Sequence, residues 1–210
     1  MMKQSVLCVV CAVFALTGAL VSARAEPQDA KYNKVVRIGE KAPSFTKLTG
    51  VDGKSHSLKD LKTSKAVVVI FTCNHCPIAQ AYEERLIRLT SDYKKWGLSV
   101  VAISVSHMES DGLQEMKKHA NEHKFNFPYL QDLSQDSARN LGATSTPHVF
   151  LLDGKRKIVY MGAIDDDWTG EKVEKPYLRD AVDAVLSGKK VAISESRQMG
   201  CQIEYVRKRR

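Results

Sequence analysis

The stretch Ala66-Val67-Val68-Val69-Ile70-Phe71-Thr72-Cys73-Asn74-His75-Cys76-Pro77 decides the fold of this chain. Its first half is an unbroken apolar run, which is typical of a strand that is covered on both faces. A helical pattern follows directly, because apolar residues recur at helical spacing from Ile78 to Trp96 and Gly97 closes the pattern. The two cysteines therefore lie at a strand-to-helix junction, separated by two residues.

The chemistry of this junction suits thiol–disulfide exchange. The pair Cys73 and Cys76 can form a disulfide and open it again. Unpaired backbone N–H groups and the positive end of the helix dipole favour a thiolate, which we expect on Cys73, with Cys76 resolving the mixed disulfide. His75, if protonated, would add to this stabilisation and favour the reduced form. A static structural disulfide is the alternative, but so short a loop removes little unfolded-state entropy.

The first 25 residues are expected to be a secretory signal peptide. Lys3 gives a positive start, residues 6–21 are apolar, and Ala23-Arg24-Ala25 is a small-x-small cleavage site. The apolar stretch is shorter than the roughly 20 residues of a spanning helix, so no membrane span should remain after cleavage. An uncleaved anchor is the alternative. We therefore expect a periplasmic or secreted protein.

Cleavage leaves three cysteines, Cys73, Cys76 and Cys201, in a compartment where disulfides persist. A four-cysteine zinc site would need a second pair, and we expect no metal or other cofactor. Loss of Lys3 and Arg24 lowers the net charge by two, from +8 to +6. The basic residues have no aromatic interleaving, so no nucleic-acid partner is expected, and residues 206–210 are predicted to be a solvated basic tail.

The remaining pattern predicts an α/β fold. An Asp-Gly turn between residues 45–48 and 54–57 predicts an N-terminal β-hairpin. Further along, the sequence predicts a strand at 98–105, helices at 111–123 and 134–141, a β-hairpin of 149–152 with 158–161, and a last helix at 176–186. This order predicts a central mixed β-sheet flanked by helices on both faces.

Several of these motifs together resemble the thioredoxin superfamily, in particular its peroxiredoxin-like (AhpC/TSA-related) branch, over about residues 36–205. They are the 71–77 motif, Phe127-Pro128-Tyr129-Leu130, Gly142-Ala143 with Thr146-Pro147, Asp165-Asp166 and Gly200-Cys201-Gln202-Ile203. The resemblance implies a thioredoxin-like domain and a thiol–disulfide oxidoreductase that acts on protein thiols and disulfides together with an unidentified redox partner. It also implies that Pro147 is cis and lies against the disulfide, and that the Thr146 backbone binds the partner chain.

Two other functions stay open. Peroxiredoxins, which are antioxidant thiol peroxidases, place their peroxidatic cysteine where Cys76 falls, with a threonine three residues earlier. Cys73 stands there instead, so the hydroxyl that would orient a peroxide is missing. The second alternative is a copper-binding metallochaperone module that uses Cys73, Cys76 and His148, because soft thiolates and imidazole suit Cu(I). A strand residue is the favoured interpretation of His148.

Two features have a weaker functional interpretation. Cys201 could resolve an intermediate at Cys73 or pair between chains, but a structural or free thiol is favoured. Residues 119–123, His-Ala-Asn-Glu-His, match a zinc-protease pattern, which we attribute to a solvated helix face.

Overall fold

The computed structural model describes residues 31–207. The predicted signal peptide, residues 1–25, lies outside the described residues, as do the last three residues of the predicted basic tail. Within the described range, no helix is long and apolar enough to cross a membrane.

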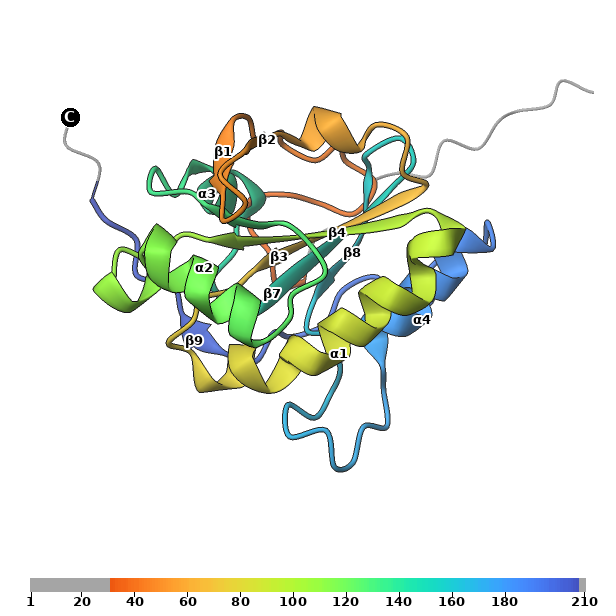
Figure 1. The fold of residues 1–210 in the computed structure, drawn as a ribbon. Helices are drawn as coiled ribbons and strands as arrows, with labels where there is room; N and C mark the ends of the chain where they lie inside the picture. Colours follow the sequence, from red (N-terminus) through yellow and green to blue (C-terminus); the bar gives the residue numbers. More distant parts are fainter. Residues whose placement is uncertain (1–30, 208–210) are drawn as a thin grey trace, which may run out of the picture.

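The described chain forms one seven-stranded sheet with the order β2-β1-β5-β4-β3-β7-β8 (Figure 1). Its strands are β1 (Leu48–Gly50), β2 (Ser55–His56), β3 (Ala66–Phe71), β4 (Leu98–Ser104), β5 (Tyr129–Gln131), β7 (His148–Asp153) and β8 (Ile158–Gly162). The α-helices are α1 (Pro77–Tyr93), α2 (Leu113–Glu122), α3 (Asp136–Leu141) and α4 (Tyr177–Leu186), and short 3-10 helices span Leu58–Leu61, Lys94–Trp96 and Glu109–Asp111.

Strand β3 is the interior strand from which the site is built. It pairs in parallel with β4, where Val68 lies opposite Val100, and antiparallel with β7, where Val69 lies opposite Phe150. All six of its residues are buried. A strand covered on both faces needs apolar side chains in both directions, which explains the unbroken apolar run. The predicted mixed sheet is confirmed.

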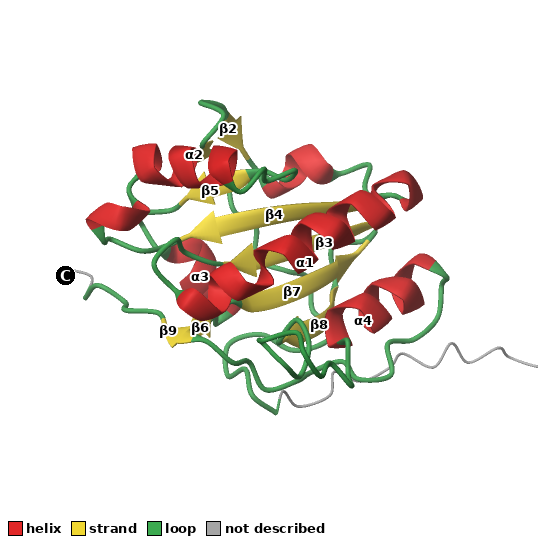
Figure 2. Cartoon of the chain, turned by 60° about the horizontal axis from the view of Figure 1, so that its bottom comes forward, coloured by secondary structure: helices red, strands yellow, loops and turns green. Residues whose placement is uncertain are grey.

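Two apolar layers hold the sheet between helices. Alternate β3 residues such as Val68 pack with α1, α2 and α4, and Figure 2 shows α1 and α4 crossing one face of the sheet. The other β3 residues, such as Val69, pack with α3, the first 3-10 helix and the segment from Val36 to Phe45. The prediction of helices on both faces is confirmed.

The structure differs from the expected elements in three places. The first hairpin strand begins at Leu48 rather than at residue 45, because Lys47 has a φ of 54°, which interrupts the extended backbone. Strand β5 was not predicted; it is only three residues long and joins β1 to β4. A two-stranded sheet of β6 (Ser145–Thr146) and β9 (Cys201–Gln202) was also missed.

The small β6–β9 sheet brings the end of the chain to the predicted redox site. Its strands run antiparallel, with Thr146 opposite Cys201. Figure 1 shows β9 beside the beginning of α1, which is the end of the helix that carries the CxxC pair. A sheet of two residues per strand gives no sequence pattern, so this placement comes from tertiary contacts.

Candidate functional site

The beginning of α1 faces Cys76. This residue is the N-cap, with extended backbone angles, and its Sγ accepts a hydrogen bond from the Ala79 N–H at 3.4 Å. Pro77 fills the first helical position, where its missing N–H costs nothing. The first turn of the helix therefore stabilises negative charge on Cys76. The helix start thus contacts Cys76, whereas its effect was expected on Cys73, three residues earlier.

The pKa values of the two thiols differ in the same direction. The hydrogen bond from the Cys73 thiol is the largest cause that lowers the pKa of Cys76, to about 4, against the opposing effect of burial. Hydrogen bonds from Cys201, Thr146 and the Ala79 N–H lower it further. The pKa of Cys73 is raised far above its ordinary value, first by its hydrogen bond to Cys76, then by burial and by the negative charge of Asp111. The pKa of Cys76, the residue that the start of α1 faces, is thus lowered relative to that of Cys73.

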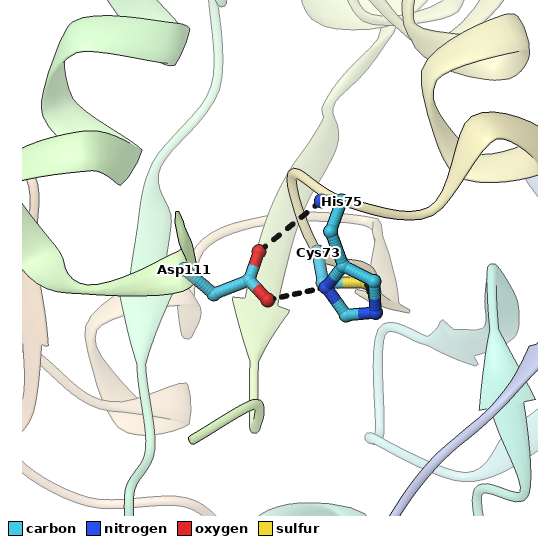
Figure 3. Close-up of side chains that lie close together, drawn as sticks. All are labelled: Cys73, His75 and Asp111. Atoms are coloured by element: carbon cyan, nitrogen blue, oxygen red, sulfur yellow. Dashed lines mark hydrogen bonds and ion pairs between the residues drawn. The ribbon is translucent and has the colours of Figure 1, made fainter. Parts of the chain in front are cut away.

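A histidine and an aspartate lie on the other side of Cys73 (Figure 3). Asp111 is fully buried at the end of the third 3-10 helix, and its Oδ1 accepts the N–H groups of Asn74 at 2.6 Å and His75 at 3.3 Å. Its Oδ2 lies 2.5 Å from the His75 Nδ1. When Nδ1 carries the proton that the carboxylate accepts, the unprotonated Nε2 is left facing Cys73, whose Sγ is 3.8 Å away. Sequence reasoning missed Asp111, because an acidic residue ahead of a helix looks like any helix cap.

The predicted cis-proline is present. The peptide bond between Thr146 and Pro147 is cis. The hydroxyl of Thr146 lies 3.4 Å from the Cys73 Sγ, and its carbonyl oxygen lies 3.1 Å from the Cys76 Sγ. Strand β9 of the same chain pairs with this segment, so Cys201 lies opposite Thr146, where a partner chain was expected.

The third cysteine is part of the site. The Cys201 Sγ lies 2.7 Å from the Cys76 Sγ. Its pKa is raised to about 11 by burial and by its contact with Cys76. Cys201 is a free thiol, as the favoured interpretation had it, and it contacts Cys76 rather than Cys73.

Two hollows give different access to the three sulfurs. A cavity of about 470 Å³ is lined by Cys73, His75, Met108, Thr146 and Tyr205. A more open hollow is lined by His75, Pro77 and Cys201. Cys76 lines neither hollow and is completely buried. The two hollows adjoin, since His75 and residues 202–205 line both, and Cys73 itself is only 4% exposed.

The predicted copper ligand His148 has a structural role. It lies in β7 opposite Phe71, is buried, and its ring stacks on Phe150 with 4.6 Å between the ring centroids. Burial lowers its pKa to about 4. Within residues 31–207, the donor atoms that cluster with Cys73 belong to His75 and Asp111, all within 4.8 Å of one another, and this set could hold a metal ion.

The histidines of the zinc-protease pattern face another helix. His119 Nε2 and His123 Nδ1 of α2 lie 2.6 and 2.7 Å from the two carboxylate oxygens of Glu83 in α1. Their donor atoms are close enough to hold a cation. Glu122, the acidic residue of the pattern, does not belong to this set. The interpretation as a solvated face is corrected for His119, whose side chain is only 14% exposed, because it packs against Glu83.

Comparisons with known proteins agree with this fold. Residues 38–161 match the AhpC/TSA family. A solved structure from Geobacillus kaustophilus, described as an uncharacterized conserved protein, is 36% identical with a TM-score of 0.79, covering 84% of this chain and 96% of that one. A hypothetical protein from Sinorhizobium meliloti is 35% identical with a TM-score of 0.77, covering 83% and 97% of the two chains. A curated protein of Halalkalibacterium halodurans, thiol-disulfide oxidoreductase ResA, is 22% identical over 142 residues, which are 67% of this chain and 77% of that protein.

Proposed function

The chain belongs to the AhpC/TSA family within the thioredoxin superfamily, and from this premise we propose that it is an exported thiol–disulfide oxidoreductase acting on protein thiols and disulfides through Cys73 and Cys76. The observation that carries the proposal is geometric: Cys73 lines the cavity, Cys76 lies behind it at the start of α1, and the cis Thr146–Pro147 bond is beside both. The likeness to a protein named thiol-disulfide oxidoreductase supports it. Export rests on the predicted signal peptide of residues 1–25.

The proposed reaction begins at Cys73, because this sulfur lines the cavity and Cys76 does not. Cys73 gives up its proton to Cys76 or to His75 and attacks one sulfur of a partner disulfide. The partner's S–S bond breaks, its other sulfur leaves and takes up a proton, and a mixed disulfide forms on Cys73. Cys76, as the thiolate, then attacks the Cys73 Sγ and releases the second partner thiol. Two electrons pass to the partner and the Cys73–Cys76 disulfide remains; the reverse steps oxidise a partner dithiol.

His75 and Asp111 act on the proton of Cys73 in this proposal. The imidazole Nε2 is the nearest base on the cavity side of Cys73, at 3.8 Å. The buried Asp111 carboxylate holds the Nδ1–H and so fixes the tautomer in which Nε2 can accept a proton. Once charged, the imidazolium stabilises the Cys73 thiolate. His75 is thus a tuning residue of the pair, and Asp111 is a positioning residue that acts through it.

Partner binding is proposed for the cavity beside Thr146 and Pro147. The Thr146 hydroxyl lies 3.4 Å from the attacking sulfur, so it can orient a bound disulfide. The thiol peroxidase alternative has less support. Cys76 holds the low pKa that a peroxidatic cysteine needs, but its sulfur is completely buried and Cys73 occupies the place of the threonine hydroxyl.

Insulin reduction with dithiothreitol tests the proposal. We expect Cys73→Ser to abolish turnover, since it removes the attacking sulfur, and Cys76→Ser to trap a mixed disulfide that non-reducing electrophoresis detects. Leu133→Ala is the control, because Leu133 is exposed and lines neither hollow. It should keep turnover within about twofold of the wild type. A twofold change in rate corresponds to well under 1 kcal/mol of activation free energy, as expected of a surface substitution. Full turnover by Cys73→Ser would refute the proposal.

A further inference from the structure

Resting on the proposed function, we infer that Cys201 is a third redox thiol, which exchanges with the Cys73–Cys76 disulfide by attack on Cys76. The geometry that points to it is the contact of 2.7 Å between the sulfurs of Cys76 and Cys201. The two cysteines are separated by 125 positions in the chain, so this contact depends on the β6–β9 sheet.

The backbone holds Cys201 in register with the site. Thr146 and Cys201 lie opposite one another in the β6–β9 pair, and the N–H of Ile203 donates to the Thr144 carbonyl oxygen at 3.0 Å. Gly200 allows this close approach, because a Cβ at that position would lie 2.1 Å from the Thr146 carbonyl oxygen. The end of the chain therefore occupies the strand position that a bound partner segment would take, with its own thiol on Cys76.

The exchange needs no additional oxidant. The Cys201 Sγ attacks the Cys76 Sγ, the Cys73–Cys76 bond breaks, and a Cys76–Cys201 bond forms. Both electrons of the broken bond leave with Cys73, and the proton lost by Cys201 is taken up by the Cys73 thiolate, directly or through His75. The His75 Nε2 and the Thr146 hydroxyl, at 3.8 and 3.4 Å from the Cys73 Sγ, both face this leaving sulfur.

The two hollows give this exchange a consequence for partners. Cys73 lines the cavity, whereas Cys201 lines the adjoining hollow beside His75 and Pro77. Exchange through the buried Cys76 thus moves an oxidising equivalent from Cys73, at the cavity, to Cys201, at the adjoining hollow. The chain can then receive electrons at Cys201 from one protein dithiol and deliver them at Cys73 to another protein's disulfide. The Cys76–Cys201 disulfide also fixes β9 against the start of α1.

Disulfide mapping tests the inference. The purified protein is oxidised with one equivalent of diamide, quenched with acid and N-ethylmaleimide, digested at low pH and analysed by non-reducing mass spectrometry. We expect the wild type to give both Cys73–Cys76 and Cys76–Cys201 peptides. We expect Cys73→Ser to give the Cys76–Cys201 disulfide within one chain, and Cys201→Ser to give Cys73–Cys76 only.

Gly200→Ala is the matched variant, because it keeps all three cysteines. Its added Cβ displaces β9, so the Cys76–Cys201 peptide should fall at least tenfold while the Cys73–Cys76 peptide persists, which also verifies the fold around the pair. A Cys73→Ser protein that stays fully reduced or only dimerises, or an undiminished Cys76–Cys201 peptide in Gly200→Ala, would overturn the inference. If the Cys76–Cys201 peptide is missing while insulin is still turned over, only this inference fails. If the peptide forms but insulin is not turned over, only the proposed function fails.

Discussion

At the scale of single residues, the position of one negative charge sets the redox chemistry. The pKa of Cys76 is the one that is lowered, since two neighbouring thiols and the Ala79 N–H in the first turn of α1 hydrogen-bond to its sulfur. Cys73 keeps its proton, because the Cys76 thiolate and the Asp111 carboxylate surround it with negative charge. The sulfur that lines the cavity is therefore not the one whose pKa is lowered. Activation of Cys73 requires proton movement, for which Cys76 and His75 are the adjacent acceptors.

The reduction potential of the pair should fall by about 30 mV per pH unit between pH 5 and pH 8. In this range the reduced pair holds one proton, on Cys73, because the pKa of Cys76 is lowered to about 4 and that of Cys73 is raised. Reduction then takes up one proton for two electrons, so higher pH disfavours the reduced form. Equilibration of Cys201→Ser with glutathione at several pH values isolates the pair. A slope near 59 mV would mean that both thiols are protonated and that the assignment of the thiolate is incorrect.

At the scale of elements, the junction of β3 with α1 creates both the fold and the site. Strand β3 ends at Phe71 and α1 begins at Pro77, so only five residues, 72–76, carry the CxxC pair between the two. Asp111 fixes this loop from outside by accepting two of its backbone N–H groups. The loop geometry is thereby set before any partner binds. Cys76 serves this element twice, as the N-cap of α1 and as the buried sulfur.

Substitutions at Cys76 separate its capping role from its redox role. Serine is among the preferred N-cap residues, whereas alanine cannot accept the Ala79 N–H. We expect Cys76→Ala to be less stable than Cys76→Ser by about 1 kcal/mol, measured by urea unfolding under reducing conditions. Both variants lack the sulfur, so their difference isolates the cap. Equal free energies of unfolding would show that the Cys76 side chain does not cap α1.

At the scale of the whole molecule, the seven-stranded sheet brings together the site segments that are distant in the sequence. Its two apolar layers hold α1, α2 and α4 on one face, and α3 with the N-terminal segment on the other. Strand β7 follows the cis-proline directly and pairs with β3. The Thr146-Pro147 segment, just before β7, and the CxxC loop, just after β3, therefore lie at the same edge of the sheet. The geometry of the site depends on the packing of this sheet.

Shortening a side chain in the core of the sheet should lower the free energy of unfolding much more than shortening one at the surface. Leu151 of β7 is completely buried between β3 and α4, so Leu151→Ala should cost about 2–5 kcal/mol of unfolding free energy. Leu133 is 53% exposed and is the matched control. Leu133→Ala should stay within about 0.5 kcal/mol of the wild type. Urea unfolding followed by circular dichroism measures both, and similar losses for the two variants would contradict this account of the core.

The sequence by itself determined the features that depend on neighbouring residues. The unbroken apolar run of β3, the helical spacing of α1 and the position of the CxxC pair between them are local patterns, and burial imposes such patterns on each element separately. They sufficed for the mixed sheet and the helices on both faces, whereas the cis Thr146–Pro147 bond was expected from the family resemblance alone. Short elements such as β5 and β9 lack enough residues to form a pattern.

Only the tertiary structure decided which distant groups meet at the sulfurs. Asp111 reaches His75 from 36 positions away, and Cys201 reaches Cys76 from 125 positions away. A hydrogen bond or a sulfur contact is determined by the distance between two atoms, and residue spacing along the chain does not encode that distance. The location of the thiolate follows the same rule, since moving the start of a helix by three residues moves its positive end from one cysteine to the other.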